Sequence, residues 1–252
     1  MTSKPSVLLP IAAGTNRNQD LADAFVAAGA DVHQVPLQAL REGEAKLSDH
    51  QMLALPGGFS YGDALGAGRL LALDLRTWFE DQLMEAAESQ MPMFGVCNGF
   101  QALVASGLLP GEPTPAASLA ENASGSFECR WVELSTAGST SPWLAGSEDP
   151  LWCPVAHGEG RFTAVDVDEI ERSGLVALRY STEGRQADGV YPANPNGSVN
   201  DIAGITDPTG LIFGLMPHPE NHIWARQNPL RGRSDRGTCL SLFESGVKAA
   251  GG

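Results

Sequence analysis

The sequence has few cysteines, and it contains no long apolar run. Its four cysteines, in a chain of 252 residues, are widely separated and form no Cys-x-x-Cys pair and no Cys/His pattern with metal-ligand spacing. A disulfide framework is therefore not expected, and a reducing cytoplasm is the predicted location. No apolar stretch is long enough to cross a bilayer, and the first residues lack the apolar core of a signal peptide.

Positive charge is also scarce. The chain carries 16 Lys and Arg residues against 30 Asp and Glu residues, a formal net charge of −14, and no basic run offsets this balance. Such a surface disfavours the phosphates of nucleic acids and of anionic membranes, so neither partner is expected. Because the acidic residues are scattered without metal-like clustering, we also expect no metal site.

Short apolar runs alternate with helical patterns in the first part of the sequence. Buried strands are predicted at 7–11, 32–35, 52–55 and 92–96, and helices at about 19–28, over 70–87 and from 101 onward. This alternation is typical of an α/β protein with a doubly wound, mainly parallel sheet. Ligands bind such sheets at the carboxyl ends of the strands.

The second part of the sequence is less regular. We predict a loop over 111–126, strands at 127–134, 151–156, 175–180, 202–205 and 211–216, and a last helix over about 238–249. Without long helices between them, these strands are expected to form a partly antiparallel extension of the parallel sheet. No linker is visible, so 1–252 is predicted to be a single domain, with 221–236 as an irregular surface insertion.

A cysteine between two glycines follows the predicted strand at 92–96. The segment from Gly95 to Gln101, GVCNGFQ, places the thiol of Cys97 at the apex of a sharp turn between a strand and a helix. Glycines at 95 and 99 allow strand and helix to approach closely, and the helix N-terminus favours a thiolate. This is a nucleophile elbow with sulfur in place of oxygen. Taken alone, the segment also fits a buried structural cysteine.

A cysteine nucleophile needs a base, and the chain has five histidines. Two of them, His157 and His218, stand two residues before a glutamate, Glu159 and Glu220, which an extended chain brings within reach of the imidazole. His218 ends a buried strand between two prolines, and that stiffness suits a catalytic base. Glycines surround His157 instead. We therefore favour His218 with Glu220, and His157 remains the alternative.

Acyl transfer also needs backbone N–H donors for a developing oxyanion. The amides of Gly58 and Asn98, expected at neighbouring strand ends, are candidates for this role. The glycine-rich segment 57–62 has a rival interpretation as a phosphate loop, but no Walker lysine follows it and its spacing is not that of a dinucleotide-binding turn. The remaining cysteines lack a glycine-flanked turn and are predicted to be structural: Cys129, Cys153 and Cys239.

These features resemble the class I, or triad, glutamine amidotransferases, whose elbow reads Gly-x-Cys-x-Gly-x-Gln. Gly95, Cys97, Gly99 and Gln101 match that pattern. Longer segments extend the resemblance over nearly the whole chain and narrow it to the glutaminase subunits of phosphoribosylformylglycinamidine synthase. They are PGGFSYGD at 56–63, FECRWV at 127–132, HGEGRF at 157–162, NPNGS at 194–198 and MPHPE at 216–220.

The resemblance implies roles for individual residues. Cys97 would attack the carboxamide of glutamine, and His218, oriented by Glu220, would protonate the departing ammonia. Water would then hydrolyse the γ-glutamyl thioester. The oxyanion would be held by the amides of Gly58 and Asn98, and Gln101 would fix the substrate or the elbow.

The resemblance also implies a partner, and no cofactor bound by this chain. Ammonia would pass to a synthetase subunit that makes phosphoribosylformylglycinamidine in de novo purine synthesis, with a small bridging subunit if the synthetase is of the short type. ATP and magnesium would be used by that subunit and not by this chain. The segment 221–236 is predicted to contact the synthetase.

Three alternatives share parts of this pattern. A glutaminase subunit of another amidotransferase and a stand-alone γ-glutamyl cysteine hydrolase would have the same triad, and the longer segments argue against the former. Steady glutamine turnover by the isolated chain would favour the stand-alone hydrolase. A non-catalytic regulatory subunit would keep the fold, but the joint presence of Cys97, His218 and Glu220 argues against it.

Overall fold

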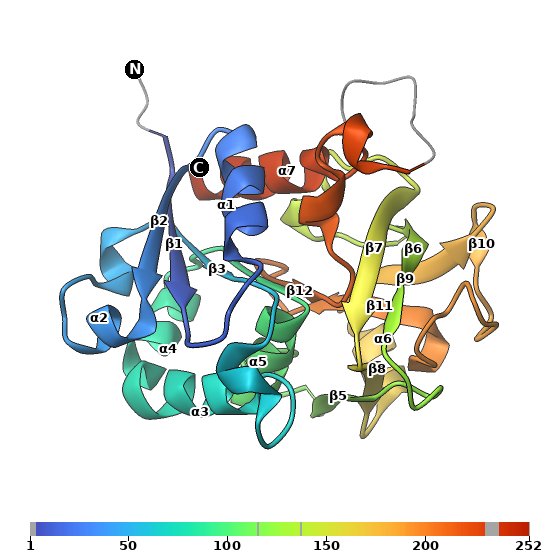
Figure 1. Ribbon diagram of the computed structural model, residues 1–252, viewed down its shortest axis with the longest axis horizontal. Helices are drawn as coiled ribbons and strands as arrows, with labels where there is room; N and C mark the ends of the chain where they lie inside the picture. Colours follow the sequence, from blue (N-terminus) through green and yellow to red (C-terminus); the bar gives the residue numbers. More distant parts are fainter. Residues whose placement is uncertain (1–3, 115, 137, 230–236, 252) are drawn as a thin grey trace.

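A computed structural model describes residues 4–114, 116–136, 138–229 and 237–251. Its main sheet has the strand order β2-β1-β3-β4-β12-β11-β9-β6-β7, with β10 paired to β9. Helices α1 and α7 lie on one side of the parallel strands, and α3, α4 and α5 lie on the other (Figure 1). A second sheet consists of β5 and β8.

The strands are β1 Ser6–Ile11, β2 Asp31–Pro36, β3 Met52–Leu55, β4 Met93–Val96, β5 Ala117–Glu121, β6 Glu128–Ser135, β7 Leu151–His157, β8 Glu159–Ala164, β9 Val176–Thr182, β10 Arg185–Gln186, β11 Ile202–Thr206 and β12 Ile212–Leu215. The helices are α1 Asn18–Ala27, α2 Leu37–Arg41, α3 Arg69–Trp78, α4 Glu80–Glu88, α5 Asn98–Ser106, α6 Val167–Arg172 and α7 Leu240–Gly251. Within the described ranges, none of these helices has the length and apolar character that a membrane span requires.

The sheet divides into two parts by strand direction. Strands β2, β1, β3, β4 and β12 pair in parallel, whereas β11, β9, β6 and β7 pair antiparallel with their neighbours. The predicted α/β fold with a parallel core and an antiparallel extension is confirmed. We call these parts the parallel core and the antiparallel extension.

Strand β4 is held tightly from both faces. On one face, the ring of Phe94 packs against Phe25 of α1, Trp143 and Phe243 of α7, with centroid distances of 5.9, 5.2 and 5.5 Å, within the range of favourable aromatic pairs. On the other face, Gly95 lies against α5. The strand that leads to Cys97 is therefore a rigid support.

Some elements differ from the sequence-based expectation. The helix predicted over 70–87 is two helices, α3 and α4, because Phe79 leaves helical geometry at φ −130° and is buried between them. The loop predicted over 111–126 contains β5, which pairs with β8. The short helices α2 and α6 were not predicted, since five or six residues are too few for a clear helical period.

The segment 221–236 was predicted to be a surface insertion. Residues 230–236 lie outside the described residues. Before them, His222, Ile223 and Ala225 are buried, and Nδ1 of His222 lies 2.6 Å from the backbone oxygen of Trp152 on β7. The prediction is therefore wrong for His222, Ile223 and Ala225, whose burial was hidden by the polar composition of the whole segment.

Candidate active site

Cys97 sits at the turn between β4 and α5. Its backbone has φ 50° and ψ −108°, a conformation that residues with a Cβ rarely adopt. A Cβ at position 99 would lie 2.1 Å from the backbone oxygen of Leu55, and one at position 95 would lie 2.9 Å from the backbone of Gly99. The steric role predicted for Gly95 and Gly99 is thus confirmed: helix α5 approaches β3 and β4 at backbone distance.

His218 follows β12, the parallel neighbour of β4. Its Nδ1 lies 2.6 Å from Oε1 of Glu220, and both side chains are almost fully buried. Prolines at 217 and 219 flank the histidine, and Pro219 begins the short helical turn Pro219–His222. The two prolines restrict the backbone that positions His218 and Glu220. The other imidazole nitrogen, Nε2, has no hydrogen-bond partner in the described part of the chain. It is therefore available to a thiol or a ligand.

Gly57 connects the nucleophile with this pair. A Cβ at Gly57 would lie 2.8 Å from Cε1 of His218 and 3.4 Å from Cβ of Cys97. The loop that follows β3 therefore passes close to both residues. The structure brings Cys97, His218 and Glu220 together at adjacent strand ends.

The electrostatics of His218 favour its protonated form. Burial lowers the pKa of this imidazole, but attraction to the Glu220 carboxylate, with a smaller contribution from Cys97, outweighs burial and raises the pKa to about 10. A protonated imidazole beside a sulfur nucleophile is suited to donate a proton to a leaving group.

This shift predicts how stability depends on pH. The folded-state pKa of His218 is about 10, above the unfolded value of 6.5, so folding takes up a proton in the interval between them. The stabilisation is fully present below about pH 6.5 and is lost as the pH rises through about 10. We expect the denaturation midpoint to fall over this interval, and to fall less in His218→Asn. Equal decreases in both proteins would contradict the assignment.

The candidate oxyanion donors come from two segments, the loop after β3 and the first residue of α5. Gly58 has φ +120°, and a Cβ there would lie 2.6 Å from Oδ1 of Asn16, so only glycine fits this position. Asn98 is the first residue of α5, and its backbone N–H has no partner within the helix. Its side chain ties the glycine-rich loop to the elbow, because Oδ1 accepts from the Ser60 hydroxyl and Nδ2 donates to Asp63 at 2.9 Å.

A cavity of about 180 Å³ opens onto the sulfur. It is lined by Gly58, Phe59, Asp63, Ala67, Cys97, Gln101, Phe127 and residues 156–159. Gln101 also braces the wall, since its Nε2 donates to the backbone oxygen of Glu159. Of the predicted site residues, Cys97, Gly58 and Gln101 line the cavity, and His218, Glu220 and Asn98 are buried beside them.

Several residues were not predicted to line this cavity. Asp63, Phe127 and Glu159 lie within segments that the sequence analysis singled out, but nothing in their spacing indicates a shared cavity. Burial, together with repulsion from Glu159, raises the pKa of Asp63. The two carboxyl groups therefore lie close enough to repel each other across the same cavity.

His157, the alternative base, has different partners. Its Nδ1 lies 3.0 Å from Oδ1 of Asn122, and Glu159 accepts instead from the backbone N–H of Ala67 at 3.3 Å. Burial, and then repulsion from His218, lowers the pKa of His157 to about 4. Only the second of the two predicted His-x-Glu pairs is formed in the structure.

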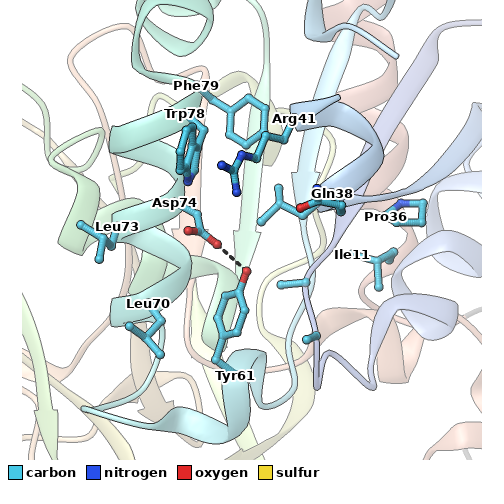
Figure 2. Close-up of a pocket in the computed structure, with 13 residues that line it drawn as sticks. Ile11, Pro36, Gln38, Arg41, Tyr61, Leu70, Leu73, Asp74, Trp78 and Phe79 are labelled. Carbon is cyan, nitrogen blue, oxygen red and sulfur yellow. Dashed lines mark hydrogen bonds between the residues drawn. The ribbon is translucent and has the colours of Figure 1, made fainter. Parts of the chain in front are cut away.

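A larger cavity, of about 600 Å³, lies between the ends of β1 and β2 and helix α3. Figure 2 shows Tyr61 pointing toward Asp74, to which its hydroxyl donates, and Arg41 beside Trp78. The guanidinium carbon of Arg41 lies 3.4 Å from the centroid of the Trp78 ring. This cavity contains none of the predicted site residues, so the smaller one is the candidate active site.

The sequence matches a known family. A family described as the CobB/CobQ-like glutamine amidotransferase domain matches residues 4–248. The chain belongs to this family. The resemblance to class I glutamine amidotransferases is thereby confirmed.

Curated relatives of this amidotransferase include subunits of one synthase. This chain is 40% identical to phosphoribosylformylglycinamidine synthase subunit PurQ of Treponema denticola, over 97% of this chain and 98% of the relative. It is 38% identical to subunit PurQ of Methanococcus maripaludis, over 89% of this chain and 85% of the relative. These alignments run through both the parallel core and the antiparallel extension.

Solved structures agree with the amidotransferase fold. A chain in the structure of PurLQS from Thermotoga maritima superposes with a TM-score of 0.75 at 32% identity, covering 98% of this chain and 99% of that one. A glutamine amidotransferase from Thermotoga maritima gives a TM-score of 0.53 at 17% identity, over 89% of this chain and 79% of that one. The second likeness concerns the fold alone.

Substituting Gly57 tests the contact between the loop and the triad. In Gly57→Ala the added methyl would displace the His218 ring, which lies 2.8 Å from its position. We expect kcat for glutamine hydrolysis to fall about 100-fold, as for other small misplacements of a catalytic group. Gly146→Ala is the matched control, because its Cβ would meet only the Ser245 hydroxyl, at 3.2 Å. Unchanged kcat in Gly57→Ala would mean that the imidazole has room to move without loss.

Proposed function

We propose that Cys97, His218 and Glu220 form the catalytic triad of a glutaminase. The chain hydrolyses glutamine to glutamate and ammonia as the glutaminase subunit of a phosphoribosylformylglycinamidine synthase in de novo purine synthesis. The observation that carries the triad is the position of Gly57, where an added Cβ would meet both Cys97 and His218, together with the bond from Nδ1 of His218 to Glu220.

The first half of the reaction forms a thioester. The sulfur of Cys97 attacks the carboxamide carbon, and the negative charge that develops on oxygen is stabilised by the backbone N–H groups of Gly58 and Asn98. As the C–N bond breaks, its electron pair stays on nitrogen, which takes a proton from Nε2 of His218 and leaves as ammonia. Glu220 stabilises the imidazolium until that transfer.

The second half regenerates the enzyme. Water attacks the thioester carbon, and His218, now neutral, accepts its proton. The C–S bond breaks with its electron pair on sulfur, and glutamate leaves. The proton taken from water stays on His218, which restores the starting protonation of the Cys97–His218 pair. No redox step and no bound cofactor is needed in this sequence.

The cavity has the chemistry to hold the rest of glutamine. Its α-ammonium group is complemented by the carboxyl groups of Asp63 and Glu159, which lie in the same wall. Gln101, 5% exposed, holds that wall in place through its bond to the backbone of Glu159. The volume of about 180 Å³ suits a ligand of amino-acid size.

A synthetase subunit that receives the ammonia belongs to the proposal. The structure of PurLQS from Thermotoga maritima supports it, since a chain of that structure superposes over 98% of this one. A small bridging subunit completes the proposed complex, and ATP and magnesium are used by the synthetase. A cytoplasmic location is also proposed, and it is supported by the free thiols of all four cysteines.

A reconstitution tests this function. The synthetase from the same source, active with ammonium, ATP and formylglycinamide ribotide, is combined with this chain and with any bridging subunit. We expect glutamine to become an effective nitrogen donor when this chain is added. If glutamine stays inert beside a synthetase that uses ammonium, the assignment to this synthase is wrong. Steady hydrolysis of γ-glutamyl peptides by the isolated chain would instead indicate a stand-alone hydrolase.

A further inference from the structure

The side-chain amide of Asn98 connects three segments around the cavity. Its Oδ1 accepts from the hydroxyl of Ser60 and, at 3.4 Å, from the backbone N–H of the same residue. Its Nδ2 donates to Oδ1 of Asp63 at 2.9 Å and to Oε1 of Gln101 at 3.4 Å. Gln101 donates in turn to the backbone oxygen of Glu159. The amide therefore joins the loop after β3 to α5 and, through Gln101, to the turn between β7 and β8.

The direction of each hydrogen bond in this chain is fixed by its ends. A backbone carbonyl can only accept, so Gln101 turns its amide nitrogen to Glu159 and its amide oxygen to Asn98. A backbone N–H can only donate, so the amide oxygen of Asn98 faces Ser60. The nitrogen of Asn98 consequently faces Asp63. Burial raises the pKa of Asp63, and the hydrogen bond from Asn98 opposes that rise, so this bond favours the carboxylate form.

Asp63 depends on neighbouring contacts for its position. Its backbone has φ 53°, in the left-handed region that residues with a Cβ rarely adopt, and such a conformation persists only where the surroundings hold it. Asp63 lines the cavity that contains Cys97. Its second carboxylate oxygen, Oδ2, has no hydrogen-bond partner among the described residues, and it is not fully buried. Oδ2 is therefore open to a ligand, while Oδ1 is held by Asn98.

We propose that the side chain of Asn98 is the positioning residue for the Asp63 carboxylate, and that it thereby sets how well the site selects the α-ammonium group of glutamine. This inference rests on the proposed function and deepens it. The amide holds Oδ1 and leaves Oδ2 to the ammonium group. The side chain thus has a role separate from that of the backbone N–H of Asn98, because the backbone acts on the oxyanion and the side chain on the opposite end of the substrate.

A selectivity ratio measures this role in the reconstituted complex. It is kcat/KM for glutamine divided by kcat/KM for 4-carbamoylbutanoate, which is glutamine without its α-amino group. Damage to the fold or to the oxyanion donors lowers both values and leaves the ratio unchanged, whereas a displaced Asp63 lowers the ratio. We expect a decrease of about tenfold in Asn98→Ala, which keeps the backbone N–H at this position, and of about 30-fold in Asp63→Asn, the range for hydrogen bonds to charged groups.

Three further variants separate the two ends of the amide. Ser60→Ala removes a partner of Oδ1 and leaves the bond to Asp63, so it should change the ratio less than about twofold. The double variant Asn98→Ala/Asp63→Asn should have the ratio of Asp63→Asn alone, because Asn98 acts through Asp63. Asn98→Ser has a side chain too short to reach Asp63 and should lower the ratio as Asn98→Ala does. It replaces the alanine variant if thermal unfolding shows that the latter is not folded.

Other outcomes would overturn the proposal. An unchanged ratio in Asp63→Asn would remove the contact with the ammonium group, and losses that add in the double variant would mean that Asn98 does not act through Asp63. If 4-carbamoylbutanoate is not hydrolysed, glutamine alone decides: KM should rise in Asn98→Ala with little change in kcat, and a loss confined to kcat would contradict the proposal. A wild-type complex that does not hydrolyse glutamine refutes the proposed function itself, which is a distinct result.

Discussion

Replacing Cys97 with alanine should abolish glutamine-dependent synthesis and leave ammonium-dependent synthesis by the complex intact. The variant lacks the atom that forms the thioester, and loss of a nucleophile costs about 10⁴-fold or more in turnover. The fold should tolerate the change, because alanine retains the Cβ that already occupies this conformation. The measurement is the rate of the complete synthase with glutamine and, separately, with a saturating ammonium salt.

Cys129→Ala is the matched control for this experiment. Cys129 is an exposed cysteine on β6, outside the cavity, and its removal should leave both activities unchanged. Loss of both activities in Cys97→Ala would contradict a design in which one subunit makes ammonia and another uses it. Retention of glutamine use would exclude Cys97 as the nucleophile.

Replacing His218 with alanine should lower glutamine hydrolysis by about 10⁴-fold, close to the loss in Cys97→Ala. Cys97 and His218 act in the same chemical step, so the losses caused by their removal should not add. The activity of the double variant should therefore resemble that of either single variant. The readout is ammonia released from glutamine in the reconstituted complex, compared among the two single variants and the double variant.

His157→Ala serves as the comparison for His218→Ala. Both histidines are buried, 4% and 3% exposed respectively, but only His218 is bonded to a glutamate. The loss in His157→Ala should fall well short of the loss in His218→Ala. Equal losses would reopen the choice of catalytic base. A smaller loss in His218→Ala than in His157→Ala would reverse it.

The residues of the candidate catalytic centre could be picked out from the sequence because they lie close together in short segments. Gly95, Cys97 and Gly99 form one turn, and their steric requirement is local. The His218–Glu220 pair is also local, and its formation depends only on the proline-stiffened chain between them. The parallel core, though not the order of its strands, was predicted from the alternation of apolar runs and helices.

The walls of the cavity could not be read in this way, because they depend on contacts between distant segments. The bond between His157 and Asn122 joins residues 35 positions apart, and no periodic pattern predicts such a pair. Strand β5 exists through its pairing with β8, and the buried His222 is held by the backbone of Trp152 on β7. Each of these features depends on tertiary contacts, which local sequence preferences do not determine.

The two parts of the sheet contribute differently to the cavity. Cys97 and His218 come from β4 and β12 of the parallel core, whereas the wall at 156–159 comes from the turn between β7 and β8. The wall meets the sulfur through a backbone atom, the carbonyl oxygen of Ala156, 3.8 Å from Sγ. A substitution that changes only the side chain at position 156 therefore leaves in place the atom that meets the sulfur.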